Sequence, residues 1–201
     1  MAVKQETDDA REFNRRSATY ESSWEQWLFF DRLQRAVLGL VESEANPESI
    51  LDVGCGTGRL LRKAGERWPN ARLIGVDPAE GMIEKARLLM PNATFYVSMA
   101  ESLPLPDGSV DLAFSTASFH HWRDNVQGVR EVRRVLRPGG RFFLADIWPP
   151  LGLSKIFRHF RANDPARVRD VFVRAGLNVQ AQRKLMGRFL LVTAGIPFSL
   201  M

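Results

Sequence analysis

The sequence is poor in the residues that build disulfide-rich or metal-centred proteins. Its 201 residues include a single cysteine, Cys55, and three histidines. One cysteine excludes an internal disulfide and any metal site built on several cysteines. Long apolar runs are missing too, so no segment approaches the length of a membrane span, and the polar first residues do not resemble a signal peptide. We therefore expect a cytoplasmic protein without a metal centre.

The composition is that of an ordinary globular domain, with 45% hydrophobic and 25% charged residues. The net charge of +5 is unevenly distributed. Residues 1–122 contain 13 basic and 18 acidic side chains, whereas residues 123–201 contain 15 basic and 5 acidic ones. A basic C-terminal half can attract nucleic acid, an anionic membrane or an acidic small molecule. Because aromatic residues do not alternate with the basic ones, a solvated surface is favoured over a nucleic-acid site.

The most informative segment is rich in glycine. Residues 50–58 read Ile-Leu-Asp-Val-Gly-Cys-Gly-Thr-Gly, which predicts a short buried strand followed by a tight turn into a helix. The three glycines leave out every Cβ where the backbone must pass close under a ligand. A second apolar run ends at Asp77, whose carboxylate can bind both hydroxyls of a ribose. The pattern predicts the nucleoside-binding half of a doubly wound sheet.

The spacing of the glycines distinguishes between nucleosides. They fall as Gly54-x-Gly56-x-Gly58, whereas a dinucleotide-binding turn reads Gly-x-Gly-x-x-Gly. Asp52 stands two residues before the first glycine, and its carboxylate can reach an ammonium group, which NAD does not offer at this place. The segment resembles motif I of the class I S-adenosylmethionine (SAM)-dependent methyltransferases.

The resemblance extends over Tyr20 to Ala194 and is greatest to the small "type 11" methyltransferases. Three further segments carry it, in the expected order: residues 73–82, residues 110–122 and residues 136–146. It implies SAM as the cofactor and S-adenosylhomocysteine as its product. It also implies one methyltransferase domain over 1–201, with an N-terminal helical lid at 1–45 and a catalytic core at 46–195.

One position departs from the family pattern. The family usually carries Asp-Ala after the third strand, and that Asp accepts a hydrogen bond from the adenine amino group. This chain reads Ser98-Met99-Ala100-Glu101, so Met99 stands in place of the acid. Met99 can pack against adenine through its thioether, and Ala100 can still offer its backbone N–H. The departure keeps an alternative open: a SAM-binding partner subunit that does not catalyse.

Short strands and helices alternate along the chain, which predicts an α/β fold with a mostly parallel, Rossmann-like doubly wound sheet. The turn at Met186-Gly187 predicts an antiparallel last strand pair, and the resemblance implies the strand order 3-2-1-4-5-7-6. The expected helices are 8–16, 22–42, 57–67, 79–89, 123–136 and one from Pro165, capped by Asp164, to near Gly176. The expected strands are 50–54, 72–77, 93–97, 110–115, 140–147, 177–184 and 189–194.

Ligands of such sheets lie outside the carboxyl ends of the strands. The predicted cofactor-binding residues come from those ends and, by resemblance, from the lid. They are Tyr20, Asp52, Gly54, Cys55, Gly56, Gly58, Asp77, Pro78, Met82, Met99, Ala100, Glu101, Ser115, Thr116 and His120.

Methyl transfer from a sulfonium is a direct displacement, to which alignment alone can contribute roughly 7–11 kcal/mol. A base is needed only when the acceptor must lose a proton, and the candidate catalytic residues are His120, His121 and Tyr20. A structural role for the histidines, capping helix 123–136 or packing beside Trp122, is the alternative.

Aromatic residues in the N-terminal segment and a short apolar second cap at residues 148–163 favour a small, largely apolar or aromatic methyl acceptor. O-, C- and N-methylation all stay open, as do a monomer and a homodimer. A nucleic-acid methyltransferase is the rival interpretation. It is weakened because residues 115–119, Ser-Thr-Ala-Ser-Phe, lack the Asn/Asp-Pro-Pro-aromatic motif typical of enzymes that methylate base nitrogens.

Overall fold

The structure is a computed structural model that describes residues 30–41, 46–147, 164–185 and 190–198. In this part of the chain seven strands form one sheet, in the order β3-β2-β1-β4-β5-β7-β6. The predicted order is therefore confirmed. Several predictions lie outside the described residues: the helix at 8–16, the first part of the helix at 22–42, Tyr20, the second cap at 148–163 and the turn at Met186-Gly187.

The elements lie close to their predicted positions. The strands are β1 (Ser49–Val53), β2 (Arg72–Asp77), β3 (Thr94–Val97), β4 (Val110–Thr116), β5 (Leu136–Ile147), β6 (Leu177–Leu185) and β7 (Leu190–Pro197). The helices are α2 (Asp31–Leu38), α3 (Arg59–Arg67), α4 (Glu80–Leu89), α5 (Asn125–Val135) and α6 (Pro165–Arg174), with one 3₁₀ turn, η2 (Phe119–His121).

The sheet is parallel except at its last strands. β1 pairs in parallel with β2 and β4, β3 with β2, and β5 with β4, while β7 is antiparallel to both β5 and β6. β5 begins four residues earlier than predicted, because Leu136 already pairs with Val110. The register shifts before Leu112 pairs with Arg141, so residues 137–140 form an irregularity inside the paired region rather than a turn before the strand.

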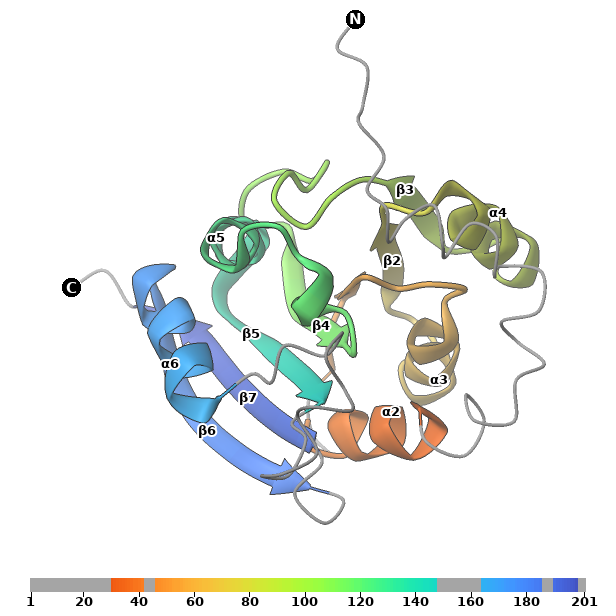
Figure 1. Ribbon diagram of the computed structural model, residues 1–201. Helices are drawn as coiled ribbons and strands as arrows, with labels where there is room; N and C mark the ends of the chain where they lie inside the picture. The colour runs from red at the N-terminus through yellow and green to blue at the C-terminus, as the bar shows by residue number, and fades with distance from the viewer. Residues whose placement is uncertain (1–29, 42–45, 148–163, 186–189, 199–201) are drawn as a thin grey trace, which may run out of the picture.

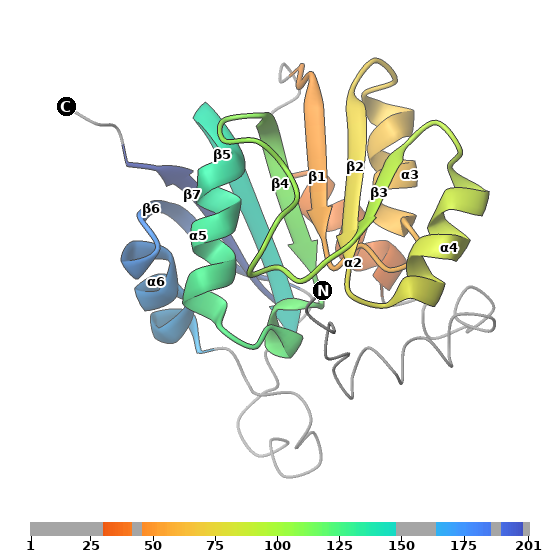
Figure 2. The same ribbon diagram turned by 90° about the horizontal axis from the view of Figure 1, so that it is seen from above.

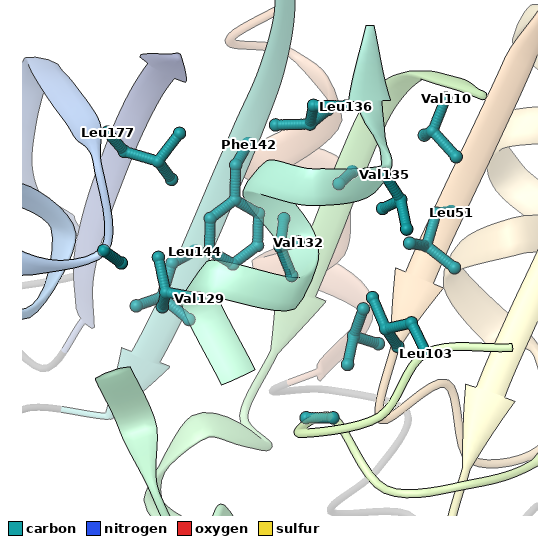
Figure 3. Packing of buried hydrophobic residues seen from close by; sticks show 14 of the residues in the cluster. Leu51, Leu103, Val110, Val129, Val132, Val135, Leu136, Phe142, Leu144 and Leu177 are labelled. Atoms are coloured by element: carbon teal, nitrogen blue, oxygen red, sulfur yellow. The ribbon is translucent and has the colours of Figure 1, made fainter. Parts of the chain in front are cut away.

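Helices cover both faces of the sheet (Figure 1), which is why every residue of β1 is buried, Ser49 and Asp52 included. On one face, α5 and α6 pack on the sheet through residues that include Val129, Val132 and Phe172. Figure 3 shows Val129, Val132 and Val135 of α5 beside Phe142 and Leu144 of β5. On the other face, α2, α3 and α4 pack with Ile50 and Phe114. The two buried layers hold the carboxyl ends of the strands in place.

Hydrogen-bonded caps fix where two of the helices begin. The Asp164 carboxylate accepts from the Ala166 N–H at 2.7 Å with Pro165 at the first position, which confirms the predicted start of α6. Asp124 caps α5 by accepting from the Gln127 N–H at 3.0 Å, so the alternative in which a histidine caps this helix is wrong. The helix predicted to reach residue 42 ends at Leu38, and Gly39 follows it. No helix in the described ranges is long and apolar enough to cross a membrane.

Candidate active site

A pocket opens at the carboxyl ends of β1, β2 and β4, whose arrowheads lie at one edge of the sheet (Figure 2). Together with the open solvent at its mouth, the space in this pocket is about 1020 Å³. The pocket is lined by the glycine turn and Asp77, by residues 98–101, and by Ser118, His121 and Trp122 of the loop after β4. The pocket lies where a doubly wound sheet binds its ligands.

Two glycines of the turn are required by contacts and backbone angles. Gly54 has φ +77°, and a Cβ built on it would lie 1.8 Å from the Ser118 Oγ, so the loop after β4 packs directly on this glycine. Gly56 has φ +52°, and a Cβ there would meet no atom within 4 Å. The Gly56 N–H donates to the Asp77 Oδ2 at 2.9 Å. The turn is thus joined to the end of β2 and to the loop after β4.

Asp77 is held rigidly at the pocket wall. Its second oxygen, Oδ1, accepts from the Ala79 N–H at 2.9 Å. Burial raises the pKa of Asp77 to about 6, against the opposite effect of the hydrogen bonds from Ala79 and Gly56. A carboxylate has about four acceptor positions, and the backbone takes two of them. The remaining positions can accept from a pair of ligand hydroxyls.

Asp52 lies behind the pocket wall, with 1% of its surface exposed. Burial, followed by the charge of Asp77, raises the pKa of Asp52 to about 8. Its Oδ1 has no hydrogen-bond partner among the described residues. A buried carboxylate oxygen without a hydrogen-bond donor is costly in the free protein.

The loop after β4 gives its two histidines different environments. The His120 Nδ1 lies 2.9 Å from Asp146 Oδ1, and the backbone N–H of His120 donates to Asp146 Oδ2 at 2.9 Å. Both side chains are almost fully buried. Since an ionised carboxylate can only accept, the His120 proton belongs on Nδ1 when the ring is neutral. The His121 ring packs against that of His120, with 4.0 Å between centroids and a tilt of 43° between the ring planes, and it lines the pocket.

Other contacts fix the shape of this loop. Ala117 has φ +51°, an unusual angle for a residue other than glycine, and lies on the pocket wall. The indole Nε1 of Trp122 donates to the Ser118 Oγ at 3.2 Å. The Phe119 and Trp122 rings meet edge to face at 5.1 Å. His121 and Trp122 both line the pocket, and the alternative in which a histidine packs beside Trp122 stays a prediction.

The pocket brings together most of the residues predicted from sequence. Its lining includes Gly54, Cys55, Gly56, Asp77, Pro78, Met82, Met99, Ala100, Glu101, Thr116 and His121. Four predicted residues stand behind the lining: Asp52, Gly58, Ser115 and His120. Ser115 is fully buried within β4. For these four, contact with a ligand stays a prediction, and Tyr20 lies outside the described residues.

Several lining residues escaped the sequence analysis. Gln34 faces the pocket one helical turn after Phe30, and Arg59 is the first residue of α3 after the glycine turn. The i, i+4 spacing of Phe30 and Gln34, and the place of Arg59 directly after Gly58, were the available signals. The pairing of Asp146 with His120 had no local signal, because 26 residues separate the partners.

Comparison with known proteins identifies the family. The sequence profile of the methyltransferase domain matches residues 51–144. The solved structure of the YcgJ protein of Bacillus subtilis, an uncharacterized methyltransferase, superposes with a TM-score of 0.60 at 30% identity, covering 75% of this chain and 73% of that one. The chain belongs to the methyltransferase domain family. The resemblance inferred from the motifs is thereby confirmed.

Curated relatives of this methyltransferase domain act on different acceptors. The malonyl-[acyl-carrier protein] O-methyltransferase of Hahella chejuensis is 33% identical over 159 residues, which are 73% of this chain and 56% of the relative. The demethylmenaquinone methyltransferase of Thermotoga maritima is 34% identical over 107 residues, 53% of this chain and 47% of the relative. The chain thus spans about half the length of each, and family membership does not define its acceptor.

Proposed function

We propose that the protein is a SAM-dependent methyltransferase that transfers a methyl group to a small, largely apolar or aromatic acceptor. One observation carries the proposal: the glycine turn is bonded to Asp77 at the wall of a pocket that also includes His121 and Trp122. A nucleoside held by Asp77 would occupy one part of this pocket and leave the part near the two aromatic side chains for an acceptor.

The residues of the site fit the donor groups of SAM. The molecule carries an ammonium group, a ribose diol and an exocyclic amino group, all of which donate hydrogen bonds. The chain supplies Asp52, Asp77 and Glu101 around the turn and the pocket. Asp52 Oδ1 and Glu101 Oε2 are buried and have no hydrogen-bond partner in the part of the chain that the structure describes. Such orphaned acceptors are expected where a ligand completes the hydrogen bonding.

Bound SAM would supply a methyl group on a positively charged sulfur. The residues of the pocket would hold the acceptor in line with that methyl group and exclude water. The apolar side chains of Phe30 and Trp122 line the pocket and suit an apolar acceptor. Alignment by these walls is the main contribution that the described residues offer.

His121 is our candidate base for an acceptor that must lose a proton. It lines the pocket, whereas His120 is buried against Asp146. His120 therefore acts as a positioning residue: Asp146 fixes its ring, and the tilted His121 ring packs against it. An acceptor carbon or amine that is already nucleophilic would need neither histidine. Tyr20 remains a proposed lid residue over the methionine end of the cofactor.

Binding and transfer test the proposal separately. Calorimetry with S-adenosylhomocysteine is expected to give a dissociation constant, and NAD is expected not to bind. Labelled SAM is then offered with quinols, phenols, short fatty acids and tRNA. Transfer to one of the small molecules supports the proposal, and transfer to tRNA alone would establish the nucleic-acid rival instead.

Binding without transfer to any acceptor would favour the partner-subunit alternative. Asp77→Asn is the matched control for both steps, because the amide keeps the volume of the carboxyl group but loses its charge. A cytoplasmic location, a monomeric or homodimeric state and the division into a lid at 1–45 and a core at 46–195 stay predictions within this proposal.

A further inference from the structure

A second concave surface lies between α2 and α3, and we call it the α2–α3 groove. Its charged lining residues are Arg35, Arg59, Arg62, Lys63 and Arg67, with Asp31 and Glu66. Five cations against two anions leave an excess of three positive charges at neutral pH. The excess is local, because residues 1–122 contain more acidic than basic side chains. Concentrated charge of this kind attracts a ligand of opposite sign.

Two arginines of the groove donate to backbone carbonyls. Arg62 donates to the Thr57 carbonyl at 2.9 Å, just before α3 begins. Arg67 donates to the Leu38 carbonyl at the end of α2 and to the Val41 carbonyl at 3.0 Å. A carbonyl group carries no net charge, so these bonds hold the guanidinium groups in place without cancelling their charge.

The groove adjoins the pocket at Arg59, which lines both surfaces. Arg59 is the first residue of α3. Together with Arg62, Lys63 and Arg67 it follows the spacing i, i+3, i+4 and i+8, which places the four cations on one side of the helix. At a rise of 1.5 Å per residue the row is about 12 Å long. A row of cations thus leads from the pocket along α3.

Gln34 is a second link between the two surfaces. It lines the pocket with 7% of its surface exposed, and its Oε1 accepts from the Lys63 Nζ at 3.1 Å. Asp31 holds the same ammonium group at 2.8 Å. Since an ammonium group can only donate, the carbonyl oxygen of Gln34 faces Lys63 and the amide nitrogen does not.

The amide nitrogen of Gln34 is a donor without an acceptor. In the part of the chain that the structure describes, the bond from Lys63 is the only hydrogen bond of this side chain. Its Nε2 is not sealed off from solvent. Two amide N–H groups are therefore left for an oxygen of a ligand, at the side of the pocket that adjoins the groove.

We propose that the methyl acceptor ends in a phosphate or diphosphate group, which binds in the α2–α3 groove while the apolar part of the acceptor lies in the pocket. The inference rests on the proposed function, because it assigns a substrate class to that pocket. A phosphate ester carries about 1.5 to 2 negative charges at pH 7, which the excess of three positive charges can balance. SAM carries no phosphate, so the groove is not needed for the cofactor.

The length of the groove distinguishes a phosphate from a carboxylate. A carboxylate is a single charge that one arginine can bind with two hydrogen bonds. A row of about 12 Å suits a group with several anionic oxygens, and guanidinium groups match the geometry of phosphate. Gln34 would donate to the oxygen nearest the pocket, and Arg59 to the next.

Three probes test the proposal by calorimetry on the full chain saturated with S-adenosylhomocysteine. They are octyl diphosphate, 1-octanol and inorganic diphosphate. Octyl diphosphate is expected to bind at least about tenfold more tightly than octanol, because charge-assisted hydrogen bonds are added to the same apolar chain. Equal affinities would overturn the proposal, as would failure of both diphosphates to bind.

A matched pair of double variants separates the groove from the overall charge of the protein. Arg35→Gln with Arg59→Gln removes two charges from the groove, and Arg169→Gln with Arg174→Gln removes two from α6 on the other face of the sheet. The groove variant is expected to bind octyl diphosphate at least about tenfold more weakly, and the α6 variant within about threefold of the unchanged chain. Equal losses would show that only net charge matters and would overturn the groove as a site.

Gln34→Glu tests the amide donor, because it keeps an oxygen for Lys63 and replaces the NH₂ group with a second oxygen. Affinity for octyl diphosphate is expected to fall at least about tenfold, and affinity for octanol to stay within about threefold. If this variant does not fold, Gln34→Met, which removes both donors at similar length, takes its place with the same expectation. Unchanged affinity for octyl diphosphate would count against the contact.

The affinity for S-adenosylhomocysteine, measured on the same variants, keeps the two proposals apart. It is expected to stay within about threefold in Gln34→Glu, since the amide serves the acceptor. An equal loss for the cofactor product would place its carboxylate at Gln34 and overturn the contact proposed above. If the unchanged chain did not bind S-adenosylhomocysteine at all, the proposed function would fail, whereas tight binding of octyl diphosphate without it would still locate an anion site in the groove.

Discussion

Asp52→Asn is expected to stabilise the ligand-free protein at alkaline pH. Burial raises the pKa of this carboxyl group to about 8 from its ordinary value of 3.8. Between these values the folded protein retains a proton that the unfolded chain has released. Raising the pH through this window therefore favours unfolding. Each pH unit costs about 1.4 kcal/mol for one such proton.

The size of the effect follows from these values. From pH 6 to pH 8, Asp52 is expected to lower the free energy of unfolding by about 2 kcal/mol, since the slope vanishes as the folded pKa is approached. Asp77, whose pKa is raised to about 6, acts mainly below this window. The amide of Asn cannot ionise, so the variant should lack this pH dependence. A loss of about 2 kcal/mol is a large share of the stability of a typical domain.

Urea unfolding followed by circular dichroism at pH 6 and pH 8 measures the effect in the full chain. The expected result is a smaller decline for Asp52→Asn than for the unchanged protein, by about 2 kcal/mol. Equal declines would refute the reasoning, because they would show that the buried carboxyl group does not titrate in this window. Calorimetry adds a second arm: affinity for S-adenosylhomocysteine should fall in the variant if the carboxylate serves the ligand ammonium group.

Three further substitutions address other parts of the site. Asp77→Asn should weaken binding of S-adenosylhomocysteine more than tenfold by calorimetry, because a charge-assisted hydrogen bond contributes about 1.5–3 kcal/mol; unchanged affinity would place the ribose elsewhere. With a hydroxyl acceptor, His121→Gln should lower the rapid-quench rate of methyl transfer at least a hundredfold, because the variant has no base beside the acceptor. A larger effect of His120→Gln would reverse the roles given to the two rings. Gly128→Ala should cost about 1–3 kcal/mol in urea unfolding, because its Cβ would lie 2.4 Å from the Trp122 ring; a fully stable variant would show that the indole moves freely.

The sheet could be predicted because its signals are local. Each parallel strand is a short apolar run followed by a turn and a helix, and the motif at residues 50–58 shows which strand lies at the centre. The start of α6 followed from Asp164 and Pro165 alone. The start of β5 did not, because Arg-Pro-Gly-Gly at 137–140 reads as a turn, and only the pairing of Leu136 with Val110 extends the strand past it.

In the candidate site, too, the residues with local sequence signals could be predicted, whereas those that depend on long-range pairing could not. The glycine turn and Asp77 carry their chemistry in the sequence itself. The roles of the two histidines do not, because they depend on Asp146, a partner 26 residues away on the next strand. The same holds for Glu101. The Asp124 N–H donates to its Oε1, whereas its Oε2 has no hydrogen-bond partner among the described residues, and the sequence alone does not show this difference. Local patterns identify the residue types present, whereas long-range pairing decides which of their atoms remain for a ligand.

The close approach of Gly54 and Ser118 sets a limit on the side chains that these two positions can carry together. Ser118 already occupies the space of a Cβ at position 54, so a larger residue at either position must push the turn and the loop apart. A side chain at position 54 would also be strained by its backbone angle φ of +77°, so a smaller residue at 118 should not make a substitution there tolerable. An attempt to widen the acceptor side of the pocket through Ser118 would also move the backbone on which the nucleoside rests. Trp122 is tied to the same contact, because its indole donates to the Ser118 Oγ. Changes of acceptor preference are thus more accessible at Phe30, which lines the pocket from the segment before α2.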